Sequence, residues 1–187
     1  MEEQHITVHL NAKFQPTDRF ELEDALQTVL EKLELGEVDG GGTAMLPSGE
    51  ISSCDIEVYL KDGSPETIAK LADILNHFGI PKNSKLQYQN ALHEESETDI
   101  GTLEGLALYL NGTNLPKETY ANCDINYVIE KINELLQNSG QMYSYWEGPS
   151  ETALYFYGDS YENMRNLMQP FLTDYPLCKK CRIVQIA

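Results

Sequence analysis

Hydrophobic and polar residues alternate in several short stretches of the chain. Residues 6–10 and 56–60 each carry an apolar side chain at every second position. Alternation with a period of two is typical of a strand that buries one face. Between these stretches, apolar residues recur at helical spacing over 22–33, and Gly36 follows. The pattern predicts a strand, a helix ended by glycine, and a later strand.

The first half continues with a second helix and a closing strand. Ser64-Pro65-Glu66 is typical of a helix start, because proline is favoured at the first helical position. Apolar residues follow at helical spacing as far as Phe78, and the helix ends before Pro81. With a glycine-weakened strand over 37–45 and a short strand over 85–89, the predicted order is βαββαβ.

The second half repeats this order. A strand is predicted over 106–110, a helix over 125–136 and a hairpin over 142–157. A helix over 164–172 and a strand over 182–186 complete the set. Single residues also correspond: the run Val8-His9-Leu10-Asn11 matches Leu108-Tyr109-Leu110-Asn111. We therefore interpret the chain as one supersecondary unit present twice.

This element order, taken twice, resembles the ferredoxin-like fold, and the resemblance covers nearly the whole chain. It implies an α+β protein with two tandem βαββαβ units, each an antiparallel sheet with helices on one face. We expect a first domain at 1–90 and a second at 103–187. Residues 91–102 are expected to form an acidic, solvated linker, which holds His93-Glu94-Glu95-Ser96-Glu97.

Histidines and carboxylates are predicted to share the uncovered face of the first sheet. Residues His5 and His9 alternate with apolar neighbours on one strand, and Asp55 and Glu57 do so on another. The fold makes these strands neighbours, so the four polar side chains point away from the helices. Imidazole and carboxylate are ligands that suit zinc. The face is either a metal site or acid/base pair, or a hydrated surface without chemistry.

The corresponding face of the second sheet is aromatic. Nine of the eleven tyrosines follow residue 100, and Tyr109, Tyr155 and Tyr157 are predicted on this face, with Trp146 nearby. Amphipathic aromatic surfaces are typical of protein interfaces. Three interpretations stay open: packing between the two halves, contact with an external partner, or binding of a small ligand.

The charge of the chain changes the range of possible partners. The formal net charge is −17, and residues 1–97 hold 19 acids against 7 bases. Such a charge repels nucleic acid and speeds the approach of a basic protein. Acids of the first predicted helix are candidate contact residues: Asp18, Glu21, Asp24 and Glu31. The alternative is that the acids serve solubility alone.

No motif with known catalytic chemistry occurs in the chain. Gly40-Gly41-Gly42-Thr43 lacks the lysine and the helix start of a phosphate loop, and more simply permits a bulge or a close backbone approach. Cys178 and Cys181 form a single C-x-x-C before a strand, without the second pair that a zinc site needs. We therefore expect ordinary thiols and no cofactor. Of the two possibilities, a protein without enzymatic activity is the simpler interpretation.

Without a signal peptide or an apolar stretch long enough to span a membrane, the sequence predicts a cytoplasmic protein. Small acidic proteins of the toxin-immunity type are similar in charge and size. The stretches 36–43 and 54–59 are also similar to small bacterial proteins. The first hypothesis is a non-catalytic module that binds a basic protein, as an inhibitor or immunity protein does. The alternative is a regulatory protein that binds a metal or small molecule at the open faces, and a homodimer stays open.

Overall fold

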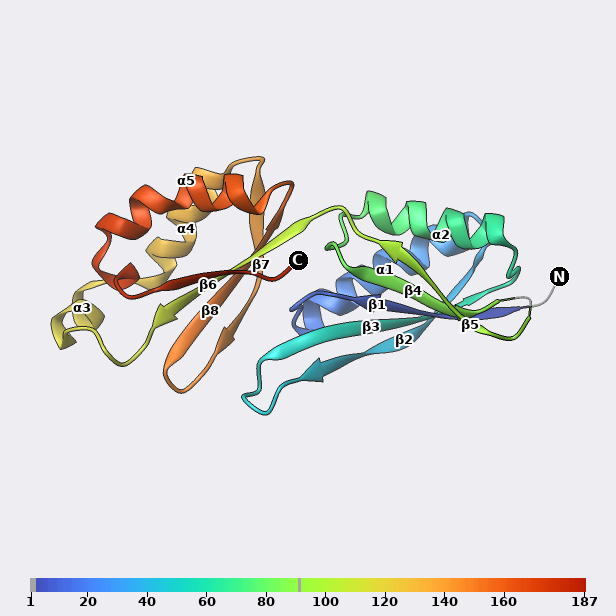
Figure 1. Cartoon of the computed structure of the whole chain (residues 1–187), viewed down its shortest axis with the longest axis horizontal. Coiled ribbons are helices and arrows are strands. Elements are labelled where there is room, and N and C mark those ends of the chain that lie inside the picture. Colours follow the sequence, from blue (N-terminus) through green and yellow to red (C-terminus); the bar gives the residue numbers. More distant parts are fainter. Residues whose placement is uncertain (1–2, 91) are drawn as a thin grey trace. The chain divides into compact units, whose positions relative to one another are not determined.

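The computed structural model describes residues 3–90 and 92–187 (Figure 1). The chain divides into two compact units. Unit 1 comprises Met1–Leu46 and Ile51–Thr102, and unit 2 comprises Pro47–Glu50 and Leu103–Ala187. The turn Pro47–Glu50 lies between two strands of unit 1 in sequence but is part of unit 2.

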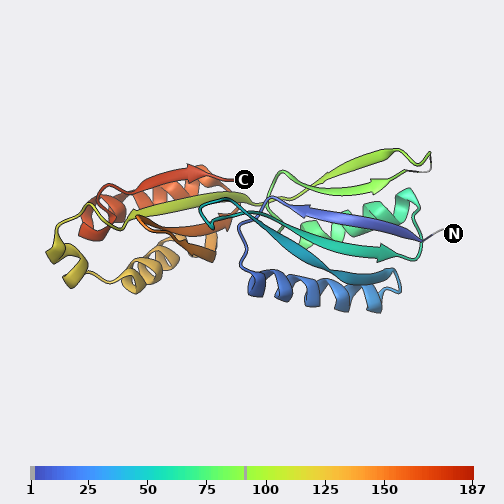
Figure 2. The same ribbon diagram turned by 90° about the horizontal axis from the view of Figure 1, so that it is seen from below.

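Unit 1 is a five-stranded antiparallel sheet with two helices on one face (Figure 2). The strands lie in the order β2-β3-β1-β4-β5. The elements in chain order are β1 (Gln4–Leu10), α1 (Pro16–Lys32), β2 (Gly36–Met45), β3 (Ile51–Leu60), α2 (Pro65–His77), β4 (Ser84–Gln89) and β5 (Glu95–Ile100).

The alternation of apolar and polar residues along the strands determines which side of the unit 1 sheet forms the core. Ile6, Val8 and Leu10 of β1 are fully buried, while the residues between them are exposed or half-buried. Leu26 of α1 and Leu71 of α2 are also fully buried. One side of the sheet therefore forms a core with the helices, and the other side carries polar residues.

Unit 2 has a four-stranded antiparallel sheet in the order β7-β8-β6-β9. The helix side of this sheet is a core of leucine, isoleucine, methionine and phenylalanine side chains. The elements are β6 (Glu104–Asn111), α3 (Lys117–Asn122), α4 (Ile125–Leu136), β7 (Gly140–Glu147), β8 (Glu151–Gly158), α5 (Tyr161–Asp174), a 3-10 turn (Pro176–Cys178) and β9 (Arg182–Gln185). The predicted α+β class with two antiparallel sheets is confirmed, and the element order is compatible with two βαββαβ-like units, to which unit 1 adds β5 and unit 2 adds α3.

The segment 91–102, which was expected to be a solvated linker, contains a strand in the structure. Residues Glu95–Ile100 form β5, which pairs antiparallel with β4 from Ser84↔Ile100 to Gln89↔Glu95. The charges in this segment suggested solvation, but an edge strand can expose every second residue to water and bury the residues between. Ile100 is buried accordingly. The predicted strand at 85–89 therefore continues into a hairpin.

The glycines of β2 have the structural role that the sequence suggested. Gly40 has φ +107° and lies at an irregularity in the β2–β3 register after Val38. A Cβ at Gly41 would lie 2.2 Å from the carbonyl oxygen of Asp55 and 2.5 Å from Arg19 Nη1. Only glycine allows the strand to pass this close to its neighbours. The positive φ of Gly40 and the close backbone approach at Gly41 therefore account for glycine at these two positions.

Among the described residues, the helices are too short or too polar to cross a membrane.

Candidate functional site

Polar side chains cover the face of the unit 1 sheet that lies opposite the helices. The strand register aligns them in rows across the sheet: Asp55, His9, Lys85 and Asp99 form one row, and Glu57, Thr7, Gln87 and Glu97 form the next. The β2 residues at the ends of these rows, Gly42 and Gly40, add no side chain. The acids of β3 thus stay accessible from that side.

Glu57 accepts two contacts from β1. His5 Nε2 lies 2.8 Å from Glu57 Oε2, and the Thr7 hydroxyl donates to the same oxygen at 2.9 Å. The His5 side chain is 48% exposed and that of Glu57 is 34% exposed. The His5 ring also lies beside the Tyr59 ring, with centroids 4.9 Å apart. The group is ordered by contacts but remains open to solvent.

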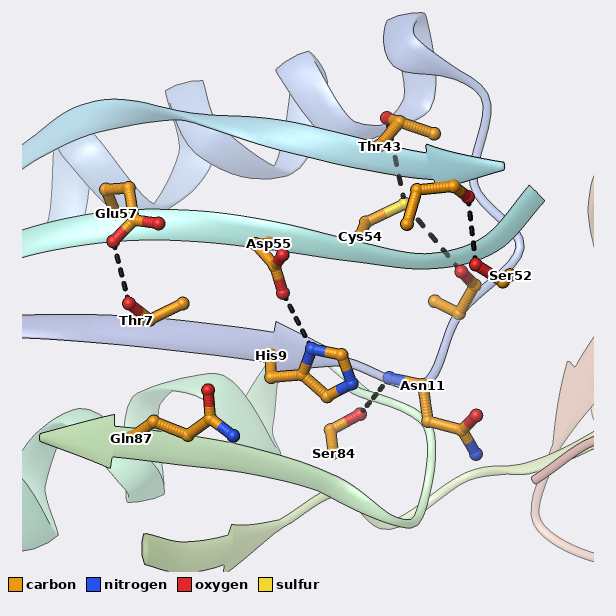
Figure 3. A network of polar contacts seen from close by, with 12 residues as sticks. Thr7, His9, Asn11, Thr43, Ser52, Cys54, Asp55, Glu57, Ser84 and Gln87 are labelled. Atoms are coloured by element: carbon orange, nitrogen blue, oxygen red, sulfur yellow. Dashed lines mark hydrogen bonds and ion pairs between the residues drawn. The ribbon is translucent and has the colours of Figure 1, made fainter. Parts of the chain in front are cut away.

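His9 and Asp55 form a second, separate pair (Figure 3). His9 Nδ1 lies 2.7 Å from Asp55 Oδ1, and both side chains are more than a third exposed. Ser84 lies near this pair in the sheet, which invites comparison with a catalytic triad. Its hydroxyl, however, is fully buried, donates to the Pro81 carbonyl and accepts from the Asn11 N–H. Since Ser84 and Lys85 alternate along β4, Ser84 points to the opposite face from His9.

The third group lies on β4 and β5. Lys85 pairs with Glu97, and Gln87 Nε2 donates to the other oxygen of Glu97 at 3.0 Å. The hydrogen bond from Lys85 lowers the pKa of Glu97, and the bond to Glu97 raises the pKa of Lys85. Lys85 is the one lysine or arginine in the five strands of unit 1. The strands of this face therefore carry far more acidic than basic side chains.

The residues proposed as metal ligands form two pairs and do not converge. His5 contacts Glu57, and His9 contacts Asp55. Within residues 3–90 and 92–187, no group of three or more histidine, cysteine or acidic side chains could hold a metal ion. A cavity of about 700 Å³ lies beside His5 at one end of the face, between β1, β4 and β5. It is lined by Gln4, His5, Gln87, Tyr88, Gln89, Glu95, Ser96 and Glu97.

The candidate acids of α1 have different surroundings. Glu21, Asp24 and Glu31 are exposed. Asp18 is half-buried at the helix start, where its Oδ2 accepts a hydrogen bond from the Gln15 N–H at 3.0 Å. Partial burial raises the pKa of Asp18, although this bond opposes the shift. Asp18 is therefore the N3 residue of a capping box whose N-cap is Gln15, and the other three acids are exposed on α1.

In unit 2, the tyrosines expected on an open face are buried. Tyr155 is 0% exposed, Tyr157 1% and Tyr109 6%. The hydroxyls of Tyr109 and Tyr155 donate to Glu50 Oε1 at 2.7 and 2.8 Å. Burial, followed by the bond to Glu50, raises the pKa of Tyr109 to about 12 and raises the pKa of Tyr155 as well. These tyrosines lack the exposure that an external contact surface requires. The hydroxyls of Tyr109 and Tyr155 instead supply the donors that the buried Glu50 carboxylate needs.

Arg182 borders this tyrosine cluster on β9. Its guanidinium binds Glu151 through two hydrogen bonds, of 3.0 and 2.9 Å, and lies 3.5 Å from the centre of the Tyr109 ring. The bond to Glu151 raises the pKa of Arg182. Trp146 is half-buried in β7, where its ring lies over Gly148. Of the four aromatic candidates, Trp146 keeps the most exposure.

The four cysteines are free thiols. Burial raises the pKa of Cys54, Cys178 and Cys181, and in Cys178 to about 12. Thiols with raised pKa values are weak nucleophiles, because the thiolate is the reactive form. The structure thus favours the structural interpretation of the C-x-x-C pair.

Sequence reasoning missed two parts of these sites. Glu97 was not selected, because β5 was interpreted as a linker, and its partners Lys85 and Gln87 on the predicted strand 85–89 were not selected either. The alternation of Glu95, Glu97 and Asp99 with smaller or apolar residues was the available signal. Glu50 had no such signal, since it lies in a turn without periodicity.

Comparisons with known proteins do not assign the chain to a family. No protein-family model matches the chain, and no curated protein sequence matches it. Solved structures that match include an anthrone oxidase-like protein, at 9% identity and a TM-score of 0.28, covering all of this chain and 94% of the other. A putative monooxygenase from Lactobacillus acidophilus NCFM matches at 8% identity and a TM-score of 0.25, covering all of this chain and 95% of the other. Likeness at this level carries no argument about function.

Proposed function

We propose that the chain is a non-catalytic module that binds a basic protein through the uncovered face of the unit 1 sheet. One observation carries this proposal: the strands of that sheet hold seven acids and a single lysine, on a face that stays open to solvent. An acidic face accelerates the encounter with a basic partner and selects against acidic ones. An inhibitor of a basic enzyme, such as an immunity protein, is one form of this function.

The geometry does not favour catalysis at the same face. Each histidine there contacts a carboxylate, but the nearby serine points to the opposite face of the sheet. A general base needs a nucleophile or a substrate proton within hydrogen-bonding reach. The polar rows are therefore better suited to recognition than to chemistry.

The decisive experiment compares three variants in which three acids are neutralised. The first carries Asp55→Asn, Glu57→Gln and Glu97→Gln on the sheet face. The second neutralises exposed acids of α1 with Glu21→Gln, Asp24→Asn and Glu31→Gln. The third is a control in unit 2 and carries the exposed positions Glu130→Gln, Glu134→Gln and Glu162→Gln. All three change the net charge by the same amount.

Proteins captured from a lysate at low salt are purified, and their dissociation constants are measured with each variant. We expect the sheet-face variant to weaken binding by about tenfold or more, since several charge pairs are lost. High salt should weaken binding to the original chain in the same direction. Equal weakening by the unit 2 control would refute the sheet face as the site. A loss confined to the α1 variant would move the site to α1.

A second candidate function is the binding of a small polar ligand in the cavity beside His5. Its support is the amide, imidazole and carboxylate lining of that cavity. A ligand that binds only the folded state raises the melting temperature. Thermal-shift screening of metabolites against the original chain and a Gln89→Leu variant would detect such a ligand.

A further inference from the structure

β5 forms one edge of the unit 1 sheet. Among the described residues its one strand partner is β4, so its outer side pairs with no strand. Edge strands expose backbone N–H and C=O groups that can pair with another chain. The side chains of such an edge determine what kind of strand can be added.

The hairpin register shows which backbone groups point outward. The Asn90 N–H donates to the Glu94 carbonyl at 2.9 Å, so these two residues form a hydrogen-bonded pair. Bonded and non-bonded pairs alternate along an antiparallel ladder. The even-numbered residues of β5 therefore bond to β4. The N–H and C=O groups of Glu95, Glu97 and Asp99 point to the open edge.

The side chains of these three residues lie on the uncovered face, opposite Gln89, Gln87 and Lys85. All three acids are exposed. A strand added antiparallel to β5 would place every second side chain directly opposite one of them. Opposite charges at such positions stabilise strand pairing, and like charges oppose it. Charge thus favours a basic strand, and disfavours a second copy of β5 itself.

We propose that the edge of β5 binds an extended basic segment of the partner, with lysine or arginine at every second position, as an added antiparallel strand. This inference rests on the proposed function and names the element of the partner that is recognised. The cavity of about 700 Å³ that Glu95 and Glu97 help to line borders the same edge. It has room for the end of a long basic side chain.

The test uses a short capped peptide that alternates lysine and threonine, with the full-length chain. Two modified peptides have the same composition. One is N-methylated at the lysines, whose N–H groups would face β5, and the other at the threonines, whose N–H groups would face away. Dissociation constants are measured by fluorescence anisotropy, and protection of the Glu95, Glu97 and Asp99 amides by hydrogen exchange.

We expect methylation at the lysines to weaken binding by about tenfold or more, because several backbone hydrogen bonds are lost together. Methylation at the threonines should leave the dissociation constant nearly unchanged. The amides of Glu95, Glu97 and Asp99 should gain protection when the unmodified peptide binds. Glu95→Lys should weaken binding of the unmodified peptide, whereas the matched control Glu130→Lys in unit 2 should not.

Equal affinity of the two methylated peptides would overturn strand addition, as would a lack of binding by the unmodified peptide. So would self-association of the chain through β5, detected by sedimentation together with protection of the Glu95, Glu97 and Asp99 amides in the absence of peptide. These failures are distinct from failure of the proposed function. A natural partner that still lost affinity with the sheet-face variant would show that the face is used without an added strand.

Discussion

The order β7-β8-β6-β9 in unit 2 corresponds to β2-β3-β1-β4 in unit 1, to which unit 1 adds β5, but the faces opposite the helices differ in their side chains. In unit 1 this face carries ionised and amide side chains that are about a third to a half exposed. In unit 2 it carries tyrosines and alanines that are almost completely buried. The shared fold thus fixes which residues point away from the helices, and their chemistry decides what that face is for.

The difference is visible in one tyrosine from each of two matched strands. Tyr59 lies on β3 and Tyr155 on β8, which occupy the same place in the two sheets. Both point away from the helices, yet Tyr59 is 39% exposed and Tyr155 is 0% exposed. The Tyr155 hydroxyl binds Glu50, whereas the Tyr59 ring lies beside the His5 ring. One residue type therefore supports a buried cluster in unit 2 and an open surface in unit 1.

The largest expected effect comes from truncating these two tyrosines. Tyr155→Ala should destabilise unit 2 by about 3–5 kcal/mol, because it leaves a cavity and removes one of the two tyrosine hydroxyls that donate to Glu50. Tyr59→Ala should cost less than about 1 kcal/mol, as is usual for exposed positions. Trp146 is the single tryptophan and lies in β7, so its fluorescence during urea unfolding reports on unit 2. Amide hydrogen exchange in β1 and β3 reports on unit 1.

Tyr155→Phe is the control for the cavity, since it removes only the hydroxyl and should cost about 1 kcal/mol. Similar losses in Tyr155→Ala and Tyr59→Ala would contradict the contrast between a buried and an open face. It would mean that the tyrosine cluster of unit 2 contributes no more to stability than a surface ring.

A smaller effect is expected at alkaline pH, from a buried phenol of unit 2. Folding raises the pKa of Tyr109 to about 12, so the folded state holds this proton more tightly than the unfolded chain does. The resulting stabilisation is complete below the ordinary tyrosine pKa of about 10 and is lost as the pH approaches 12. The urea midpoint reported by Trp146 should fall over this range. It should fall less steeply in Tyr109→Phe, which has no proton to lose at this site.

Amide hydrogen exchange in β1 and β3 measures the stability of unit 1 over the same pH range. Among its described residues, unit 1 has no buried tyrosine hydroxyl bound to a carboxylate. An identical alkaline slope in Tyr109→Phe would show that this phenol does not contribute to the linkage.

How much of this contrast the sequence could predict depends on periodicity. The alternation of Ile6, Val8 and Leu10 placed His5 and His9 on the uncovered face, and the structure pairs them with Glu57 and Asp55. The sheet position of the second-half tyrosines followed from the same rule. Their burial did not, because it depends on a contact with Glu50, which is 59 residues before Tyr109 in sequence and lies in a turn.

The misjudged segment at 91–102 has a related cause. Its charges indicate solvation, and an edge strand satisfies that requirement on one face while pairing through its backbone. Composition cannot distinguish a solvated linker from a solvated strand. The register of Glu95, Glu97 and Asp99 with β4 makes that distinction, and only the fold provides it.

The smallest expected effect on the free energy of unfolding comes from breaking one pair of polar side chains on each of the two faces. His9–Asp55 in unit 1 and Arg182–Glu151 in unit 2 are both partly exposed. Asp55→Asn should change the free energy of unfolding by less than about 1 kcal/mol, since exposed pairs contribute little. Glu151→Gln should cost slightly more, because it breaks a two-bond contact to a guanidinium that also stacks on Tyr109. A loss of several kcal/mol in Asp55→Asn, measured by exchange in β1 and β3, would mean that the polar rows hold unit 1 together. The unit 1 face would then be structural, as the unit 2 face is, and its acids would no longer be free to serve a partner.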